Sequence, residues 1–360
     1  MLVSIVITNY NYGNYLAAAI DSALGQCYSA LEVIVVDDGS VDNSREIIGR
    51  YGSRITAVLK QNGGQCSCFN SGFERSRGDV VIFLDADDVL LANAAALHAE
   101  CMQNPLVVKS CGYMDVIDDR GCPTGGSIPA KLAPSGDYRE DIMKNGVSSY
   151  KSSFTSGNAW SRVFLEKVLP LPENDLIGAD GYLTAVDGLF GRIESIQETV
   201  AQYRVHGSNK GPINFRFDAG YMINRLQRRR HRLRYTGRWL GRLGYQIDSK
   251  QLQRFRDWKL VLMRYVLGLL GHQDEPVPSA LELVSSPFRK PKTGFGTRLS
   301  ACVMLALVRI LPKKNALQLA HYLLLRGNIK RTRINYGLIA QRSKVNKASG
   351  AVGTTRQARL

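Results

Sequence analysis

The stretch VVIFLDADDVL, residues 80–90, runs from five apolar residues directly into a cluster of carboxylates. Residues 80–84 read as a buried strand, and Asp85, Asp87 and Asp88 follow within four positions. Like charges at this spacing raise one another's pKa and cost free energy unless a cation lies among them. A D-x-D arrangement at a strand end suits Mg²⁺ or Mn²⁺, which in turn bridges the phosphates of a nucleotide. A solvent-exposed acidic turn can have the same D-x-D sequence, so the surrounding sequence has to distinguish a metal site from such a turn.

Strand and helix patterns alternate on the N-terminal side of this stretch. Nearly continuous apolar runs predict buried strands at LVSIVIT, LEVIVVD and RITAVL, residues 2–8, 31–37 and 54–59. Helices are predicted between them, over residues 14–27, from about residue 42, and over 65–77. This order predicts an α/β fold with a mostly parallel, Rossmann-like central sheet.

Polar clusters follow four of the predicted strands, at Thr8–Asn11, Asp37–Ser40, Asn62–Gln65 and Asp85–Asp88. Ligands of such sheets bind outside the carboxyl ends of the strands. One polar loop alone would be an ordinary connection. Four loops on one edge, one of them rich in carboxylates, predict a single ligand site.

Beyond residue 105 the pattern is looser. Residues 106–118 predict a strand pair, and residues 124–138 predict a flexible loop. The segments expected to follow are a helix over 161–168, a helix over 177–190 entered through Gly178-Ala179-Asp180, and a strand over 192–206.

The net charge of +16 conceals a division of the chain. Residues 1–210 carry 17 basic and 25 acidic residues, a net −8, whereas residues 211–360 carry 30 and 6, a net +24. This asymmetry predicts a boundary near residue 210 and a basic half with a partner of its own. A composition that is 44% apolar and 22% charged excludes a disordered chain.

The N-terminus and the cysteines bear on the compartment. The chain enters its first strand at once, without a basic segment, signal-length apolar run or cleavage site, so we expect no secretory signal. Seven cysteines, an odd number without metal-type pairing, predict reduced thiols and a cytoplasmic protein.

Two short apolar runs, residues 260–271 and 299–311, stand in the basic half. Each is too short to span a bilayer and contains an arginine. They predict either amphipathic helices that lie on anionic lipid at the inner face of the cell membrane or the core of a small helical subdomain.

Six motifs occur in a fixed order: TNYNYGNYL, VVDDGS, NGGQ, FLDADD, GAD and YRVHGSN. Together they resemble the family 2 glycosyltransferases of the GT-A fold, of the type that serves bacterial polysaccharide biosynthesis, over residues 2–210. The resemblance implies an inverting enzyme that uses Mg²⁺ or Mn²⁺. It would move a sugar from a nucleotide-diphospho-sugar, UDP above GDP or dTDP, to a hydroxyl of a glycan or lipid-linked acceptor. We therefore expect a catalytic domain over 1–215, a basic helical region over 216–345 and a disordered tail over 346–360.

The same resemblance assigns residues to the nucleotide. Thr8 and Tyr10 would flank the nucleobase, and Asp38 would accept a hydrogen bond from uracil N–H. Asn62 and Gln65 would belong to the loop that closes over the base and ribose.

The carboxylates of residues 85–88 are assigned next. Asp85 would contact the ribose, and Asp87 would be the principal metal ligand, with Asp88 as a neighbouring or alternative ligand. His206 would reach back to the diphosphate or the metal. Asp37 is left to shape the turn that follows the second strand.

On the acceptor side, Asp180 would be the general base, although a plain helix N-cap is the alternative for this residue. The family usually places an acidic residue before it, where this chain has Ala179. Ser156, Gly157 and Asn158 would lie beside the acceptor.

A second departure is Phe69, at a position where family members often carry arginine. It puts a phosphate contact at residue 69 in doubt, and Lys60 or Arg204 would have to supply positive charge instead.

Two other classes of protein share parts of the pattern. The D-x-D-x-V letters also fit haloacid-dehalogenase-like phosphatases, in which the first Asp is the nucleophile and the motif lies on the first strand; here three strands precede it. The RRRHRLR stretch and the +24 half would fit a nucleic-acid binder, but no aromatic RNA platform or DNA-reading motif accompanies them.

Overall fold

The computed structural model describes residues 1–145, 150–173, 177–207, 219–246, 258–272, 277–286 and 295–329. The expected boundary at 215 and the expected tail over 346–360 lie outside these residues. The first part of the chain alternates strands and helices: β1 (Val3–Asn9), α1 (Gly13–Leu24), β2 (Leu31–Asp37), α2 (Ser44–Arg50), a 3-10 turn (Gly52–Arg54), β3 (Thr56–Leu59), α3 (Gly64–Arg75) and β4 (Val80–Asp85). The order predicted from the sequence is confirmed over this part.

The elements that follow are shorter and more varied. They are β5 (Val89–Leu90), α4 (Ala94–Cys101), β6 (Val107–Ile117), β7 (Pro123–Ile128), β8 (Gly136–Asp137), α5 (Arg139–Asn145), a 3-10 turn (Thr155–Gly157), β9 (Asn158–Ser161), α6 (Arg162–Val168), α7 (Ala179–Leu183), α8 (Asp187–Phe190) and β10 (Arg192–Arg204).

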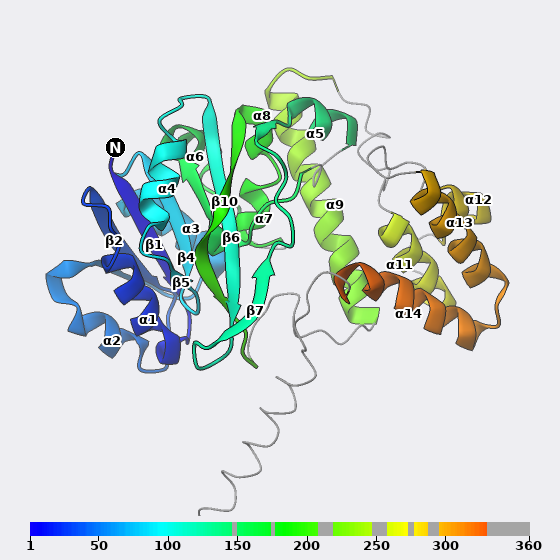
Figure 1. The fold of residues 1–360 in the computed structure, drawn as a ribbon, viewed down its shortest axis with the longest axis horizontal. Helices are drawn as coiled ribbons and strands as arrows, with labels where there is room; N and C mark the ends of the chain where they lie inside the picture. The colour runs from blue at the N-terminus through cyan, green and yellow to red at the C-terminus, as the bar shows by residue number, and fades with distance from the viewer. Residues whose placement is uncertain are drawn as a thin grey trace, which may run out of the picture.

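These strands form one sheet in the order β3-β2-β1-β4-β9-β6-β10-β5, with β7 paired to β6 and β8 to β10. The pairs β2–β3, β1–β2, β1–β4 and β6–β10 are parallel, and β9 enters antiparallel between β4 and β6. Figure 1 shows this curled sheet with helices on both faces. The predicted α/β class with a mostly parallel central sheet is confirmed.

Three predictions beyond residue 105 were wrong. Residues 107–117 form one long strand, β6, instead of a strand pair. Part of the expected loop is β7, which pairs with β6. Residues 177–190 form two short helices, α7 and α8, instead of one, because the backbone turns between residues 184 and 186.

Both faces of the parallel strands are covered, which explains their continuous apolar runs. One face packs against α1, α2 and α4, through residues such as Leu16, Ile47 and Ala95. The opposite face packs against α3 and α6, through Phe69 and Phe164. The strands are thereby fixed from both sides, and their carboxyl ends come to lie on one edge.

The basic half is helical, as predicted. Its described helices are α9 (Ala219–Arg242), α11 (Trp258–Leu269), α12 (Ala280–Ser285), α13 (Phe295–Ile310) and α14 (Lys313–Ile329). Helix α9 lies between the sheet and the group α11–α14 (Figure 1), and one continuous apolar core joins them. None of the described helices is long and apolar enough to cross a membrane.

The two apolar runs of the basic half have different surroundings. The run in α11 is almost fully buried, so the alternative of a subdomain core is confirmed for residues 260–267. Helix α13 buries one face, through Cys302, Leu305 and Val308, and exposes the other. All seven cysteines are free in this structure.

His98 on α4 is a fully buried titratable group in this sheet domain. Its Nδ1 lies 2.7 Å from the hydroxyl of Ser110 on β6. Burial lowers the pKa of His98 to about 3, because a charged imidazolium would lose its hydration. The folded protein therefore holds His98 neutral at pH values where the unfolded chain protonates it.

We expect this histidine to make the fold acid-sensitive. A group whose pKa is lowered in the folded state destabilises the fold as the pH falls below its unfolded pKa of about 6.5. Between pH 7.5 and pH 5 wild type should lose about 2 kcal/mol of unfolding free energy more than His98→Gln. Urea denaturation followed by tryptophan fluorescence measures both proteins, and an equal loss in the two would contradict the prediction.

Candidate active site

The carboxyl ends of β1, β2 and β4 meet at one edge of the sheet. In the register of these strands Thr8 lies opposite Asp85, and Asn9 lies opposite Asp37. Backbone hydrogen bonds tie the loops beyond the strands as well, from Asp38 N to Asn9 O and from Ala86 N to Thr8 O. Three of the four predicted polar clusters are thereby adjacent.

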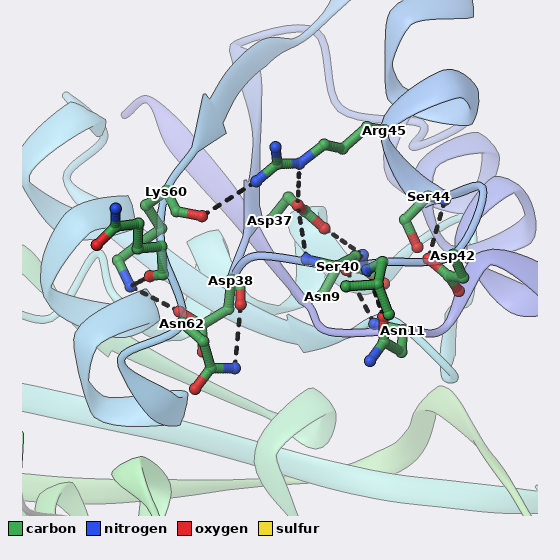
Figure 2. Close-up of polar contacts among 12 residues, drawn as sticks. Asn9, Asn11, Asp37, Asp38, Ser40, Asp42, Ser44, Arg45, Lys60 and Asn62 are labelled. Carbon is green, nitrogen blue, oxygen red and sulfur yellow. Dashed lines mark hydrogen bonds and ion pairs between the residues drawn. The ribbon is translucent and has the colours of Figure 1, made fainter.

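Asp37 organises the turn after β2 (Figure 2). Its carboxylate is fully buried and accepts hydrogen bonds from Asn9 Nδ2, Ser40 N and Arg45 Nε, at 2.8, 3.1 and 2.9 Å. Burial alone raises the pKa of this carboxyl, but the hydrogen bonds from Ser40, Arg45 and Asn9 outweigh it and the pKa is lowered. The role of Asp37 in the turn, predicted from the sequence, matches this geometry.

Asp38 faces the loop that precedes α3. Its carboxylate accepts from Lys60 Nζ at 2.6 Å and from the N–H groups of Gly63 and Gly64 at 2.9 and 2.8 Å. Asn62 Nδ2 donates to the Asp38 carbonyl oxygen at 3.1 Å. Lys60, one of the two expected sources of positive charge, thus lies against Asp38 in this structure.

Gln65, in the first turn of α3, connects two distant parts of the chain. Its Nε2 donates to Asp85 Oδ1 at 3.2 Å, and its Oε1 accepts from Ala179 N at 3.1 Å. Ala179 begins α7, and Asp180 follows it. One side chain therefore holds the strand-end carboxylate and the helix of the expected base beside each other.

The remaining carboxylates of residues 85–88 point to different partners. Asp87 Oδ2 lies 2.9 Å from His206 Nε2, so the sequence-predicted pair of metal ligands is in contact. Asp88 is almost fully buried and accepts from Arg204 N at 3.0 Å and from the Ser156 hydroxyl at 2.6 Å.

The repulsion between these carboxylates, inferred from the sequence, contributes to the raised pKa values of Asp85 and Asp88. Burial, followed by the charges of Asp87 and Asp180, raises the pKa of Asp85 to about 7. Burial, followed by the charges of Asp87 and Asp85, raises the pKa of Asp88 well above its usual range. The cluster thus holds more negative charge than its surroundings neutralise, and this favours a cation.

Tyr12 and Tyr15, which lie outside the set expected from the sequence, surround His206. The rings of Tyr12 and Tyr15 lie 5.5 and 4.8 Å from the imidazole, and the Arg204 guanidinium lies 5.1 Å from the Tyr15 ring. Arg204 Nε also donates to the Asp87 carbonyl oxygen at 2.8 Å. The aromatic residues of YNYGNY were a signal for this contact, since Tyr12 and Tyr15 lie three residues apart at the start of α1.

Ser156, Gly157 and Asn158 are buried behind the carboxylates. The Ser156 hydroxyl accepts from Asp85 N at 3.1 Å and donates to Asp88. Asn158 donates to the carbonyl oxygens of residues 153 and 154. Their polar groups bind protein atoms, so an acceptor contact by these three residues stays a prediction.

Asp180 lies in the first turn of α7, where Gly178 is the N-cap residue and makes no side-chain cap. The alternative of Asp180 as the N-cap was wrong. Burial raises the pKa of Asp180, while the positive charges of Arg232, Lys109 and Arg228 oppose this rise. A carboxylate with a raised pKa beside a ligand site suits a general base.

Comparisons with known proteins show which family the N-terminal part of this chain resembles. Residues 4–147 match the family model described as glycosyl transferase family 2. Residues 4–147 of this chain are therefore similar to the members of that family.

An uncharacterized glycosyltransferase of Nostoc sp. is 38% identical over 216 residues, which cover 58% of this chain and 66% of that protein. Another, of Rickettsia prowazekii, is 40% identical over 122 residues, which cover 33% and 38%. The chain thus spans just under two thirds of the first relative and less than half of the second. The crystal structure of TarS residues 1–349 from S. aureus aligns with a TM-score of 0.51 at 15% identity, over 89% of this chain and 91% of that chain, which shows the shared GT-A fold.

Phe69 explains one departure from the family pattern. Its ring is fully buried and stacks on Phe83 with the centroids 3.8 Å apart. Position 69 therefore faces the core of the sheet domain and offers no contact to a phosphate.

The site residues also bear on a metal ion. Among the residues that the structure describes, no three His, Cys, Asp or Glu side chains are arranged as a metal site by themselves. Asp87 and His206 supply two donors of the expected type at one point, next to surplus negative charge. Mg²⁺ is usually bound by one or two carboxylates together with substrate phosphates. The donor set fits a cation that is shared with a diphosphate.

Gly178 gives a test of the geometry around Asp180. Its φ is +76°, and a Cβ at this position would lie 3.1 Å from Asp180 Oδ1 and 3.4 Å from Gln65 Oε1. Gly52 has a φ of +53°, but within the described residues nothing lies within 4 Å of its added Cβ. We expect Gly52→Ala to lower the unfolding free energy by about 1 kcal/mol through backbone strain. Gly178→Ala should cost at least about 1 kcal/mol more, because its φ of +76° and ψ of 149° lie in a region that is almost restricted to glycine and because the added Cβ is crowded. Urea denaturation compares the two, and equal losses would contradict this geometry.

Proposed function

We propose that this chain is an inverting glycosyltransferase that moves a sugar from a nucleotide-diphospho-sugar to a hydroxyl of a glycan or lipid-linked acceptor. The match of residues 4–147 to the glycosyl transferase family 2 model supports the reaction class. The observation that carries the proposal is the Gln65 bridge, because it joins the donor-side Asp85 to the helix of Asp180. Donor and base would then act within one site.

The donor side suits a nucleoside. Tyr10 is 41% exposed at the end of β1, where its ring is available to cover a base. Asp38 lies at the carboxyl end of β2 against the Gly63-Gly64 loop. Its carboxylate would accept a hydrogen bond from a uracil N–H, so we favour UDP. Thr8 and Asn62 border the same space, and Asp85 would bind the ribose.

The chemistry needs a base and a charge-stabilising group. Asp180 takes the proton of the acceptor hydroxyl, whose oxygen forms the new bond to the anomeric carbon as the bond to the nucleoside diphosphate breaks on the opposite face. A Mg²⁺ or Mn²⁺ ion, when bound, stabilises the negative charge of the leaving diphosphate. Asp87 and His206 would hold that ion. Asp88, whose oxygens bind Arg204 N and Ser156, would add negative charge behind them.

The alternative classes gain less support. Asp85 follows the fourth strand of the chain, whereas the phosphatase pattern needs its nucleophile on the first. The RRRHRLR stretch lies in α9, where His231 and Arg232 bind residues of the sheet domain. Neither arrangement suits the phosphatase or the nucleic-acid reading.

Calorimetry tests the donor site. We expect UDP to bind wild type in the presence of Mn²⁺, and Asp87→Ala to weaken this binding at least about tenfold, since the cation links protein and diphosphate. Glu46→Ala, which removes an exposed carboxylate on α2, is the matched control and should bind as wild type does.

Asp180→Asn should keep UDP affinity and lose about 100-fold or more of the transfer rate.

Two results would overturn the proposal. One is the absence of UDP and GDP binding to wild type with either metal. The other is a transfer rate that Asp180→Asn leaves unchanged, which would exclude Asp180 as the base.

We also propose that the exposed face of α13 binds an anionic membrane surface. Leu299, Val303, Leu307 and Ile310 recur at helical spacing and are 48, 53, 37 and 76% exposed. Lys313 and Lys314 follow at the start of α14 and are exposed at the same end. Apolar side chains next to basic ones on a helix face suit insertion between anionic headgroups, and this would place the enzyme at the inner face of the membrane.

Vesicle cosedimentation tests this surface. We expect the protein to bind phosphatidylglycerol vesicles at least about tenfold more tightly than phosphatidylcholine vesicles, and salt to weaken the binding. Val303→Asp should abolish the preference, whereas Val163→Asp, at an exposed valine on α6, should not. Equal binding by both variants, or a Val303-dependent dimer without lipid binding in sedimentation velocity, would contradict the proposal.

A further inference from the structure

Side chains of helix α9 contact the short segment that follows Asp180. The Tyr182 hydroxyl lies 2.9 Å from His231 Nε2, and the Tyr182 ring packs edge-on against Tyr235 with the centroids 4.8 Å apart. Thr236 Oγ1 donates to the Ala185 carbonyl oxygen at 3.0 Å. Residues from successive turns of α9 therefore hold α7 and the residues directly after it, while Gln65 binds the first residue of α7.

Arg232 lies in the middle of this contact. Its Nη2 donates to Thr184 Oγ1 at 3.0 Å, and the Thr184 hydroxyl donates to the Asp180 carbonyl oxygen at 2.7 Å. The Thr184 N–H binds the same carbonyl oxygen at 2.9 Å. Thr184 thus links the Arg232 guanidinium to the backbone of Asp180, the proposed base, through hydrogen bonds on both sides.

The charge of Arg232 is available to Asp180. The Arg232 Nε atom is buried and makes no hydrogen bond within the described part of the chain. The other cations that act on Asp180 are Lys109 on β6, which pairs with Asp187 at 3.2 Å, and Arg228 on α9, which is exposed. Both are therefore partly neutralised, by a carboxylate or by solvent.

Negative charge reaches Asp180 from the donor side. Asp85 on β4 lies close enough for the charge of Asp180 to raise its pKa, and that repulsion acts on both groups. Tyr150 and Asp187 face Arg232 as well. Without a cation on the α9 side, burial and Asp85 would both drive Asp180 towards its protonated form, in which it cannot take a proton.

We propose that Arg232 is a positioning residue of this enzyme: it fixes the α7 turn through Thr184 and supplies the positive charge that keeps Asp180 ionised. The proposal rests on the proposed function of Asp180 as general base. It assigns a role in the reaction to an arginine of the basic half, outside residues 4–147 that match the family model.

A double-mutant cycle tests the contact without any substrate. The effects of Arg232→Met and Asp180→Asn on the urea midpoint should be non-additive at pH 8 and closer to additive at pH 4, because burial raises the pKa of Asp180 and favours the loss of its charge at acidic pH. Additivity at both pH values would overturn the charge interaction. Arg234→Met, at an exposed arginine of the same helix, is the matched control and should be additive with Asp180→Asn throughout.

Kinetics test the role in the reaction, with Mn²⁺-dependent release of UDP from UDP-sugars as the readout. In Arg232→Met we expect the acidic limb of kcat against pH to move upwards by about one unit and UDP affinity to stay as in wild type. Arg232→Lys should restore the limb, and Thr184→Val should lower kcat without moving it. A limb that is unmoved in Arg232→Met would overturn this role alone, whereas wild type that binds neither UDP nor GDP would overturn the proposed function as well.

Discussion

Four carboxylates, those of Asp85, Asp87, Asp88 and Asp180, lie at the carboxyl edge of the sheet, where burial makes negative charge costly. The sheet brings three of them there in one loop after β4, and α7 adds the fourth. Their mutual repulsion is reflected in the raised pKa values of Asp85 and Asp88. Such an arrangement weakens the fold unless positive charge compensates for it, so the surrounding residues are best understood by how they compensate.

The compensation differs from one carboxylate to the next. Asp88 binds a backbone N–H and a hydroxyl, which offset part of the cost of its burial. Asp87 binds His206, whose imidazole nitrogen could also bind a divalent cation. Asp85 has Gln65 at one oxygen. The positive charge that these carboxylates still need would come from a ligand, as in a site for a metal-bound diphosphate.

The parts that the sequence predicted well are those fixed by short-range patterns. The strands over 2–8, 31–37 and 80–85 are buried on both faces, and a long apolar run has few other structures available in an α/β order. The convergence of their polar ends follows from parallel pairing alone, so the positions of Thr8, Asp38 and Asp85 could be predicted. Asp37 could also be assigned, because a carboxylate directly before Asp-Gly-Ser suits a turn.

The parts that were missed depend on tertiary contacts. The long strand β6 and the pairing of β7 are set by neighbouring strands, and the break between α7 and α8 is set by packing against α9. The hydrogen bonds of Ser156 with Asp85 and Asp88 also depend on tertiary contacts, and its predicted place beside the acceptor stays a prediction. Position 69 faces the core because Phe83 lies opposite, which no local pattern indicates.

The position of α9 explains part of the charge asymmetry of the chain. From the sequence, a net charge of −8 over residues 1–210 and of +24 over residues 211–360 predicts a basic half with a separate partner. Part of that positive charge is instead directed at the acidic half, since Arg232 and His231 bind the segment that carries Asp180. Lys109 of the acidic half acts on Asp180 but pairs with Asp187, and α9 of the basic half brings a second cation, Arg232. The two halves are therefore electrostatically complementary where α9 meets the segment of Asp180.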